Sequence, residues 1–95
     1  MSVIRSFRDT RTHLLWLTGK SRKHPPSLIR PALRKLLLLN ATGRLDDLRV
    51  PPGNRLEALK AEREGQFSIR INDQFRICFV WKDGDAFEVE ITDYH

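Results

Sequence analysis

The chain ends in Asp93-Tyr94-His95, three side chains suited to acid–base chemistry. A histidine titrates near neutral pH and both accepts and donates protons. Carboxylates and phenols are further groups used in general acid–base catalysis. The free terminal carboxylate should stabilise the protonated form of His95 and favour an acid role. This ending therefore suits proton transfer at a ribose-phosphate, provided that a strand holds it in place.

A pair of arginines in a predicted β-hairpin is the second candidate feature. If Asn72-Asp73-Gln74 forms the loop, the apolar residues of the two strands coincide, and Arg70 lies directly across from Arg76. A two-residue loop would instead place charged residues opposite apolar ones on both faces of the hairpin. Like charges in opposed positions cost stability, so the two facing arginines suggest that a bound anion offsets their repulsion. Guanidinium groups bind phosphate in bidentate fashion. The alternative is that both side chains point into solvent or pair with acids such as Glu57 or Glu90.

The first element that must position these groups is a helix near the start of the chain. Asp9 or Thr10 can cap it, it runs to about Leu17, and Gly19 fits its end. We expect its apolar face to consist of Leu14, Leu15 and Leu17.

A second helix is predicted from Leu28 to about Asn40, after a cap at Ser27 and a basic connector at 20–26. Pro31 complicates its start, because proline is tolerated in a first turn but is costly in a helix interior. We therefore expect either a start at Pro31 or a separate turn before it. The leucines expected inward are Leu33, Leu36, Leu37 and either Leu38 or Leu39.

The rest of the chain alternates between apolar and polar residues like an antiparallel sheet. An edge strand is possible at the start of the chain, a short strand follows the Pro51-Pro52-Gly53 stretch, and a turn is expected at Asp83-Gly84. The predicted strands are Val3–Phe7, Arg55–Leu59, Phe67–Ile71, Phe75–Trp81 and Phe87–Ile91. Two helices followed by such a sheet make an α+β domain. Strict alternation puts Asp93 and His95 on the apolar row, so the last strand must bulge, twist or run past the helices for the ending to meet the arginines.

Length and charge limit the class of protein. With 95 residues we expect one domain spanning 1–95. The net charge is +5, and it is uneven: residues 1–50 hold eleven basic and three acidic side chains, whereas 51–95 hold six and nine. A basic surface suits a polyanionic partner, although a solvated basic face is the simpler interpretation.

Cysteine and histidine usage excludes several kinds of site. Cys78 is the only cysteine, so no intrachain disulfide can form, and a buried thiol in a reducing cytoplasm is expected. No stretch resembles a signal peptide or a membrane helix, which predicts a soluble cytoplasmic protein. His13 and His24 are far from the C-terminal cluster in sequence, so neither a metal site nor a cofactor is expected.

Three stretches of the sequence resemble the HigB toxin family of the RelE/ParE superfamily. They are the segment at 51–60, the segment at 65–79 and the ending Asp93-Tyr94-His95, with further likeness at 4–9 and 18–23. The resemblance implies a RelE-like fold, in which two N-terminal helices pack on a small antiparallel sheet. It also implies the toxin of a type II toxin–antitoxin system, an endoribonuclease that cleaves mRNA on the ribosome. A helix-turn-helix antitoxin is the implied partner, with operator DNA contacted only through that antitoxin.

The same resemblance implies roles for individual residues. Asp93 and His95 match the family's catalytic pair, with Tyr94 the aromatic residue between them. Arg70 and Arg76 match its phosphate-facing arginines. The implied RNA-binding residues are Lys60, Arg55 and Glu57. Some relatives have histidine in place of Glu57, so whether Glu57 acts in catalysis stays open.

A metal-free mechanism follows from these roles. Asp93 or His95 would take a proton from a ribose 2′-hydroxyl as it attacks the phosphorus, and His95 would protonate the leaving 5′-oxygen. The arginines would stabilise the phosphoryl charge. Two alternatives remain: a non-enzymatic ParE-like toxin that inhibits DNA gyrase, and a nucleic-acid-binding module without toxicity, since fold alone does not separate them.

Overall fold

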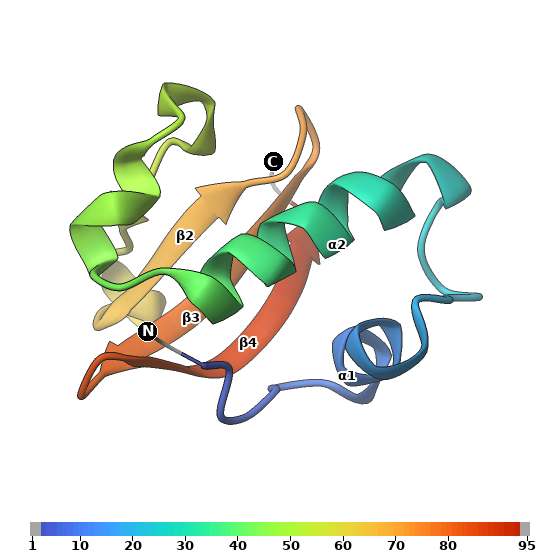
Figure 1. Cartoon of the computed structure of the whole chain (residues 1–95), viewed down its shortest axis with the longest axis horizontal. Coiled ribbons are helices and arrows are strands. Elements are labelled where there is room, and N and C mark those ends of the chain that lie inside the picture. Colours follow the sequence, from blue (N-terminus) through green and yellow to red (C-terminus); the bar gives the residue numbers. More distant parts are fainter. Residues whose placement is uncertain (1–2, 94–95) are drawn as a thin grey trace.

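The computed structural model describes residues 3–93 and consists of two helices packed on a four-stranded antiparallel sheet (Figure 1). The strand order is β1-β2-β3-β4, so each strand pairs with the next along the chain. The predicted α+β fold is confirmed. The elements are α1 (Thr10–Thr18), α2 (Pro26–Ala41), β1 (Glu57–Ala58), β2 (Gln66–Arg70), β3 (Phe75–Lys82) and β4 (Asp85–Asp93), with 3-10 turns at Leu45–Arg49, Pro52–Asn54 and Ala61–Arg63.

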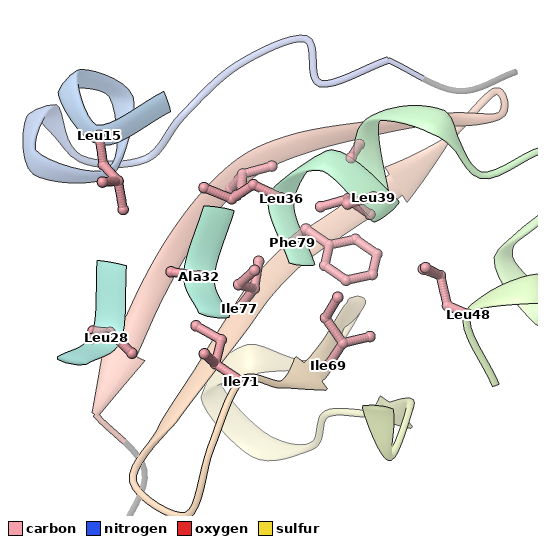
Figure 2. Close-up of a cluster of buried hydrophobic side chains, with 12 residues drawn as sticks. Leu15, Leu28, Ala32, Leu36, Leu39, Leu48, Ile69, Ile71, Ile77 and Phe79 are labelled. Carbon is pink, nitrogen blue, oxygen red and sulfur yellow. The ribbon is translucent and has the colours of Figure 1, made fainter. Parts of the chain in front are cut away.

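Helix α2 lies across one face of the sheet and buries most of the core. Figure 2 shows Leu36 and Leu39 of α2 over Ile77 and Phe79 of β3, and all four side chains are fully buried. Leu37 points away and is 58% exposed, so its predicted inward position is wrong. The α2 helix has 16 residues; neither it nor another helix within 3–93 has the length and apolar character needed to cross a membrane.

Pro31 lies inside α2. The expectation that the helix starts at Pro31, or that a separate turn precedes Pro31, is therefore wrong. The helix begins at Pro26, where a proline fits because the first helical N–H has no intrahelical acceptor. Pro31 removes one backbone hydrogen bond from the second turn. Continuation of the helix beyond it is favoured by the burial of Leu28, Ala32 and Leu36 along one face, which contributes about 1.5–3 kcal/mol for each leucine.

Helix α1 has the predicted ends but not the predicted apolar face. The Asp9 carboxylate accepts a hydrogen bond from the Thr12 N–H at 3.3 Å, and Gly19 ends the helix with a left-handed backbone (φ 70°). Only Leu15 of the three predicted leucines is buried, whereas Leu14 and Leu17 are exposed. The buried face of α1 is completed by Thr12, whose hydroxyl accepts a hydrogen bond from the Ile91 N–H of β4 at 3.1 Å.

Strand β4 contains a bulge that the sequence pattern hides. Cys78 pairs with Glu90 but Val80 pairs with Phe87, so two residues of β4 lie opposite Phe79. Glu88, one of those two, has a positive φ of 52°. Phe87 therefore shares a face with Val80 and Glu90, and the single apolar row expected through Phe87, Val89 and Ile91 is wrong.

The N-terminal segment runs parallel to β4 without forming a regular strand. Two isolated bridges join Ile4 to Ala86 and Phe7 to Val89. The second bridge meets β4 at the bulge, because Val89 is one of the two residues opposite Phe79. The backbone N–H of Arg5 and of Arg8 donate to the carbonyls of Ala86 and Val89 at 2.8 and 3.0 Å. The predicted edge strand is thus reduced to two points of contact that cover the outer edge of β4.

Candidate functional site

A polar cavity of about 220 Å³ opens where β1, β2 and β3 meet the β2–β3 loop. It is lined by Arg55, Glu57, Arg70, Asn72, Asp73 and Arg76. The cavity therefore brings together four residues that the sequence singled out and two from the hairpin loop.

The hairpin has the register predicted from its apolar residues. Arg70 pairs with Arg76, and two apolar pairs follow along the strands, Ile69 with Ile77 and Phe67 with Phe79. Because directly paired residues share a face of the sheet, both arginines lie on the face opposite the core. Asn72 holds the loop: its side-chain oxygen accepts from the N–H of Gln74 at 2.9 Å and of Phe75 at 2.8 Å.

Arg76 forms the inner wall of the cavity and is only 5% exposed. Its Nη1 donates to Glu57 Oε1 at 2.5 Å, and its Nη2 donates to the Arg55 carbonyl at 2.8 Å. Arg55 has a left-handed backbone (φ 46°), an uncommon conformation for a residue with a side chain. A buried guanidinium held by a carboxylate and a carbonyl has a fixed position, as charge stabilisation requires.

Arg70 is the more accessible of the two arginines. Its side chain is 33% exposed and forms an ion pair with the fully exposed Asp73. Exposed ion pairs contribute about 0–1 kcal/mol, so an incoming phosphate can replace Asp73 at small cost.

Lys35 of α2 is not among the residues that line the cavity. Its Nζ donates to the side-chain oxygen of the buried Asn54. Burial, followed by the charges of Arg34 and Arg70, lowers the pKa of Lys35 below its ordinary value.

The C-terminal residues are placed only in part. Thr92 pairs with Arg76, whereas Asp93 pairs with Phe75. Asp93 therefore lies on the row that faces the core, and its Oδ2 accepts from Gln74 Nε2 at 3.2 Å. The bulge in β4 lies toward the other end of the strand and does not change this. Tyr94 and His95 lie outside the described residues.

Two further expectations concern Lys60 and metal ions. Lys60 is exposed at the start of the 3-10 turn at Ala61–Arg63 and is not among the residues that line the cavity. In the part of the chain that the structure describes, no three histidine, cysteine or acidic side chains are grouped so that they could hold a metal ion.

Sequence reasoning missed Asp73 and Asn72 as parts of the site. The signal for both was present, because the matched register placed the loop next to Arg70 and Arg76, and Asn and Asp are typical turn residues.

Comparisons with known proteins identify similar chains. Residues 5–95 match the family model for HigB-like toxin, described as the RelE-like toxin of the type II toxin–antitoxin system HigB. The chain is 43% identical over 81 residues to Toxin HigB-1 of Vibrio cholerae, covering 84% of this chain and 85% of the relative. It is 42% identical over 41 residues to Endoribonuclease HigB of Proteus vulgaris, covering 43% and 45%.

Solved structures share the fold at low sequence identity. YafQ of E. coli superposes with a TM-score of 0.64 at 12% identity, covering 98% of this chain and 93% of that chain. The YoeB–YefM complex of Staphylococcus aureus matches with a TM-score of 0.56 at 15% identity, covering 100% and 98%. At these identities the likeness is one of fold.

Proposed function

The chain belongs to the HigB-like toxins, the RelE-like toxins of type II toxin–antitoxin systems, and from this we propose that it is an endoribonuclease that cleaves mRNA on the ribosome. The observation that carries the proposal is the cavity in which Arg70 and Arg76 face Glu57. One relative with 42% identity over 41 residues is named an endoribonuclease. Two facing guanidiniums suit one phosphodiester, because each can donate two hydrogen bonds to phosphoryl oxygens.

We infer that the reaction uses the RNA's own 2′-hydroxyl as nucleophile, so that the chemistry needs no metal. The 2′-oxygen forms a bond to phosphorus, and the bond from phosphorus to the 5′-oxygen breaks. Arg70 and Arg76 stabilise the charge that develops on the phosphoryl oxygens. The products are a 2′,3′-cyclic phosphate and a free 5′-hydroxyl.

Glu57 is our choice for the base that takes the 2′-proton. Its carboxylate lines the cavity, and a hydrogen bond of 2.5 Å from Arg76 Nη1 to Glu57 Oε1 fixes its position. Asp93 and His95 were the candidates in the sequence, but the pairing of Asp93 with Phe75 argues for a different role for Asp93. We propose that Asp93 positions the end of the chain through Gln74, and that His95 donates the proton to the leaving 5′-oxygen.

The proposed RNA contacts outside the cleaved phosphate are Tyr94, by stacking on a base, together with the side chains of Arg55 and Lys60. The proposed partner is an antitoxin with a helix-turn-helix fold. Family membership supports a protein antitoxin, and one structure of similar fold is the toxin–antitoxin complex RelBE2 of Mycobacterium tuberculosis.

A translation reaction tests the proposal. Purified protein is added to a defined mRNA with and without ribosomes, and cleavage is mapped by primer extension. We expect cuts in the wild-type reaction only when ribosomes are present, and none with the Arg76→Ala, His95→Ala double variant. Equal cleavage by the two proteins contradicts the proposed activity, and intact RNA together with blocked gyrase supercoiling would support the ParE-like alternative.

A further inference from the structure

A second hollow, of about 500 Å³, lies along the exposed side of α1. It is lined by Thr10, Arg11, Leu14, Thr18, Lys20, Ser21, Arg22 and Lys23. Most of the surface that these residues expose in the hollow is carbon, from Leu14 and from the aliphatic parts of the polar side chains. Helix α1 packs against β4 and α2 (Figure 1), whereas the polar cavity lies at the opposite side of the sheet, around β1. The two hollows share no residue.

Exposed leucines mark this side of α1. Leu14, which lines the hollow, is 50% exposed, and Leu17, which is not among the lining residues, is 65% exposed. Leu14, Leu17 and Thr18 follow Thr10 by four, seven and eight residues, so all four side chains share one face of α1. The opposite face, with Thr12 and Leu15, is buried against the rest of the protein. Apolar side chains grouped on a surface beside a hollow are typical of an interaction site.

The rim of the hollow is positively charged. Four of its eight lining residues are Lys or Arg, and none is acidic. Arg11 lies 3.8 Å from Asp9, but within residues 3–93 no ion pair forms to Lys20, Arg22 or Lys23. An apolar floor with a basic rim is complementary to a segment that carries apolar residues on one side and carboxylates on the other.

We propose that this hollow is the docking site for an acidic amphipathic segment of the antitoxin, an inference that rests on the antitoxin partner proposed above. Leu14 and Leu17 bind the apolar side of that segment, and Lys20, Arg22 and Lys23 bind its carboxylates. An RNA backbone would use the basic rim but would leave the leucines in water, so the leucines favour a protein partner. Docking here leaves the polar cavity uncovered by this segment.

Binding measurements on two pairs of variants test the proposal. The probe is the antitoxin encoded next to this chain in its genome, purified and titrated calorimetrically against the toxin. We expect Leu14→Ser with Leu17→Ser to weaken binding by about tenfold or more, and Lys20→Glu with Arg22→Glu to do the same. Raising the salt concentration should weaken the wild-type complex and leave the charge-reversed variant almost unchanged.

Matched controls come from exposed residues outside the hollow. Leu37→Ser replaces a leucine of similar exposure on α2, and Arg44→Glu reverses an exposed charge in the connection after α2. Both should bind the antitoxin within about twofold of wild type, as substitutions outside an interface do. All the variants should keep wild-type mRNA cleavage, which also shows that they are folded.

The outcomes separate this inference from the proposed function. Wild-type binding that both pairs of variants leave unchanged overturns the docking site alone. Loss of ribosome binding by the Lys20→Glu, Arg22→Glu variant with normal antitoxin binding also overturns it, and assigns the rim to ribosomal RNA. No binding of the antitoxin by wild type overturns the docking site and the antitoxin partner together, while the cleavage assay still reports on the nuclease.

Discussion

Glu57 and Arg76 form an ion pair in the wall of the polar cavity, with Oε1 and Nη1 separated by 2.5 Å. The two partners differ in exposure, since the Arg76 side chain is 6% exposed and that of Glu57 is 48% exposed. The arginine is therefore a fixed part of the protein, whereas the carboxylate remains open to a ligand. A proton acceptor and an anion-binding group are thus held side by side before any RNA is bound.

Replacing Arg70 tests the phosphate-binding role. Arg70→Ala should lower single-turnover cleavage of ribosome-bound mRNA by about 10²-fold, as loss of a charge stabiliser does in other enzymes. Arg49→Ala is a matched control, because Arg49 and Asp46 form an exposed pair three residues apart, as Arg70 and Asp73 do. A similar loss in both variants would show that surface charge, and not the cavity, is responsible.

Replacing Arg76 should affect both activity and stability. Arg76→Ala removes the same kind of charge and leaves the Arg55 carbonyl and Glu57 without the hydrogen bonds they receive. We expect a loss of about 10²-fold or more in turnover and a lower midpoint of denaturant unfolding. Arg76→Lys restores the charge but not the forked geometry, so it should recover stability more than activity. Full recovery of both would argue against bidentate phosphate binding.

Glu57 as general base predicts a loss of rate that only a carboxylate restores. Glu57→Gln should lower the single-turnover cleavage rate by about 10²-fold, and Glu57→Asp should recover part of it. Asp93→Asn, a change in a positioning residue, should lower the rate by less than Glu57→Gln does. A larger loss in Asp93→Asn than in Glu57→Gln would reassign the base to Asp93.

The contact between α1 and β4 depends on one hydroxyl. Thr12→Val keeps the shape of the side chain but leaves the Ile91 N–H without the acceptor it has at 3.1 Å. An unsatisfied buried donor costs about 1–3 kcal/mol, so the free energy of unfolding should fall by that amount in urea titrations. Thr10→Val, at an exposed position on the same helix, should change it by less than about 0.5 kcal/mol. Equal effects would point to helix propensity instead.

Asp85 predicts a specific dependence of stability on acid. A hydrogen bond from the Val3 N–H at 3.0 Å, followed by one from Arg5, lowers the pKa of Asp85 below its ordinary 3.8. A lowered folded-state pKa stabilises the protein above the unfolded pKa, and this stabilisation is lost as the pH falls through the folded value. Asp85→Asn should therefore be less stable than wild type at pH 7, and the two should converge once the pH has fallen through the lowered folded-state pKa of Asp85. A difference that persists in acid would contradict the prediction.

Much of the fold follows from local chemistry that can be read in the sequence. The ends of α1 are set by the side chain of Asp9 and the backbone freedom of Gly19, and the register of β2 and β3 by the matching of apolar residues across a short loop. The bulge in β4 could not be predicted, because Phe87, Glu88 and Val89 alternate like any regular strand. Runs of leucine on α1 and α2 were equally ambiguous, since several faces are apolar and only tertiary packing selects one.

The candidate site was predictable where its residues are neighbours on paired strands. Arg70 and Arg76 were placed by register alone. Glu57 was named both as an acid that could pair with these arginines and from a family resemblance. Its contact with Arg76 realises that pairing and depends on the packing of β1, a strand of only two residues.

The odd number of residues between the paired Arg70 and Arg76 restricts how this hairpin can change during evolution. Side chains alternate between the two faces of a sheet, so gaining or losing one loop residue would swap the faces of one whole strand. An arginine would then turn toward α2, and an isoleucine toward the polar cavity. Descendants of this gene should therefore tolerate changes of two residues in loop length, and changes of loop composition, far more readily than a single-residue insertion or deletion.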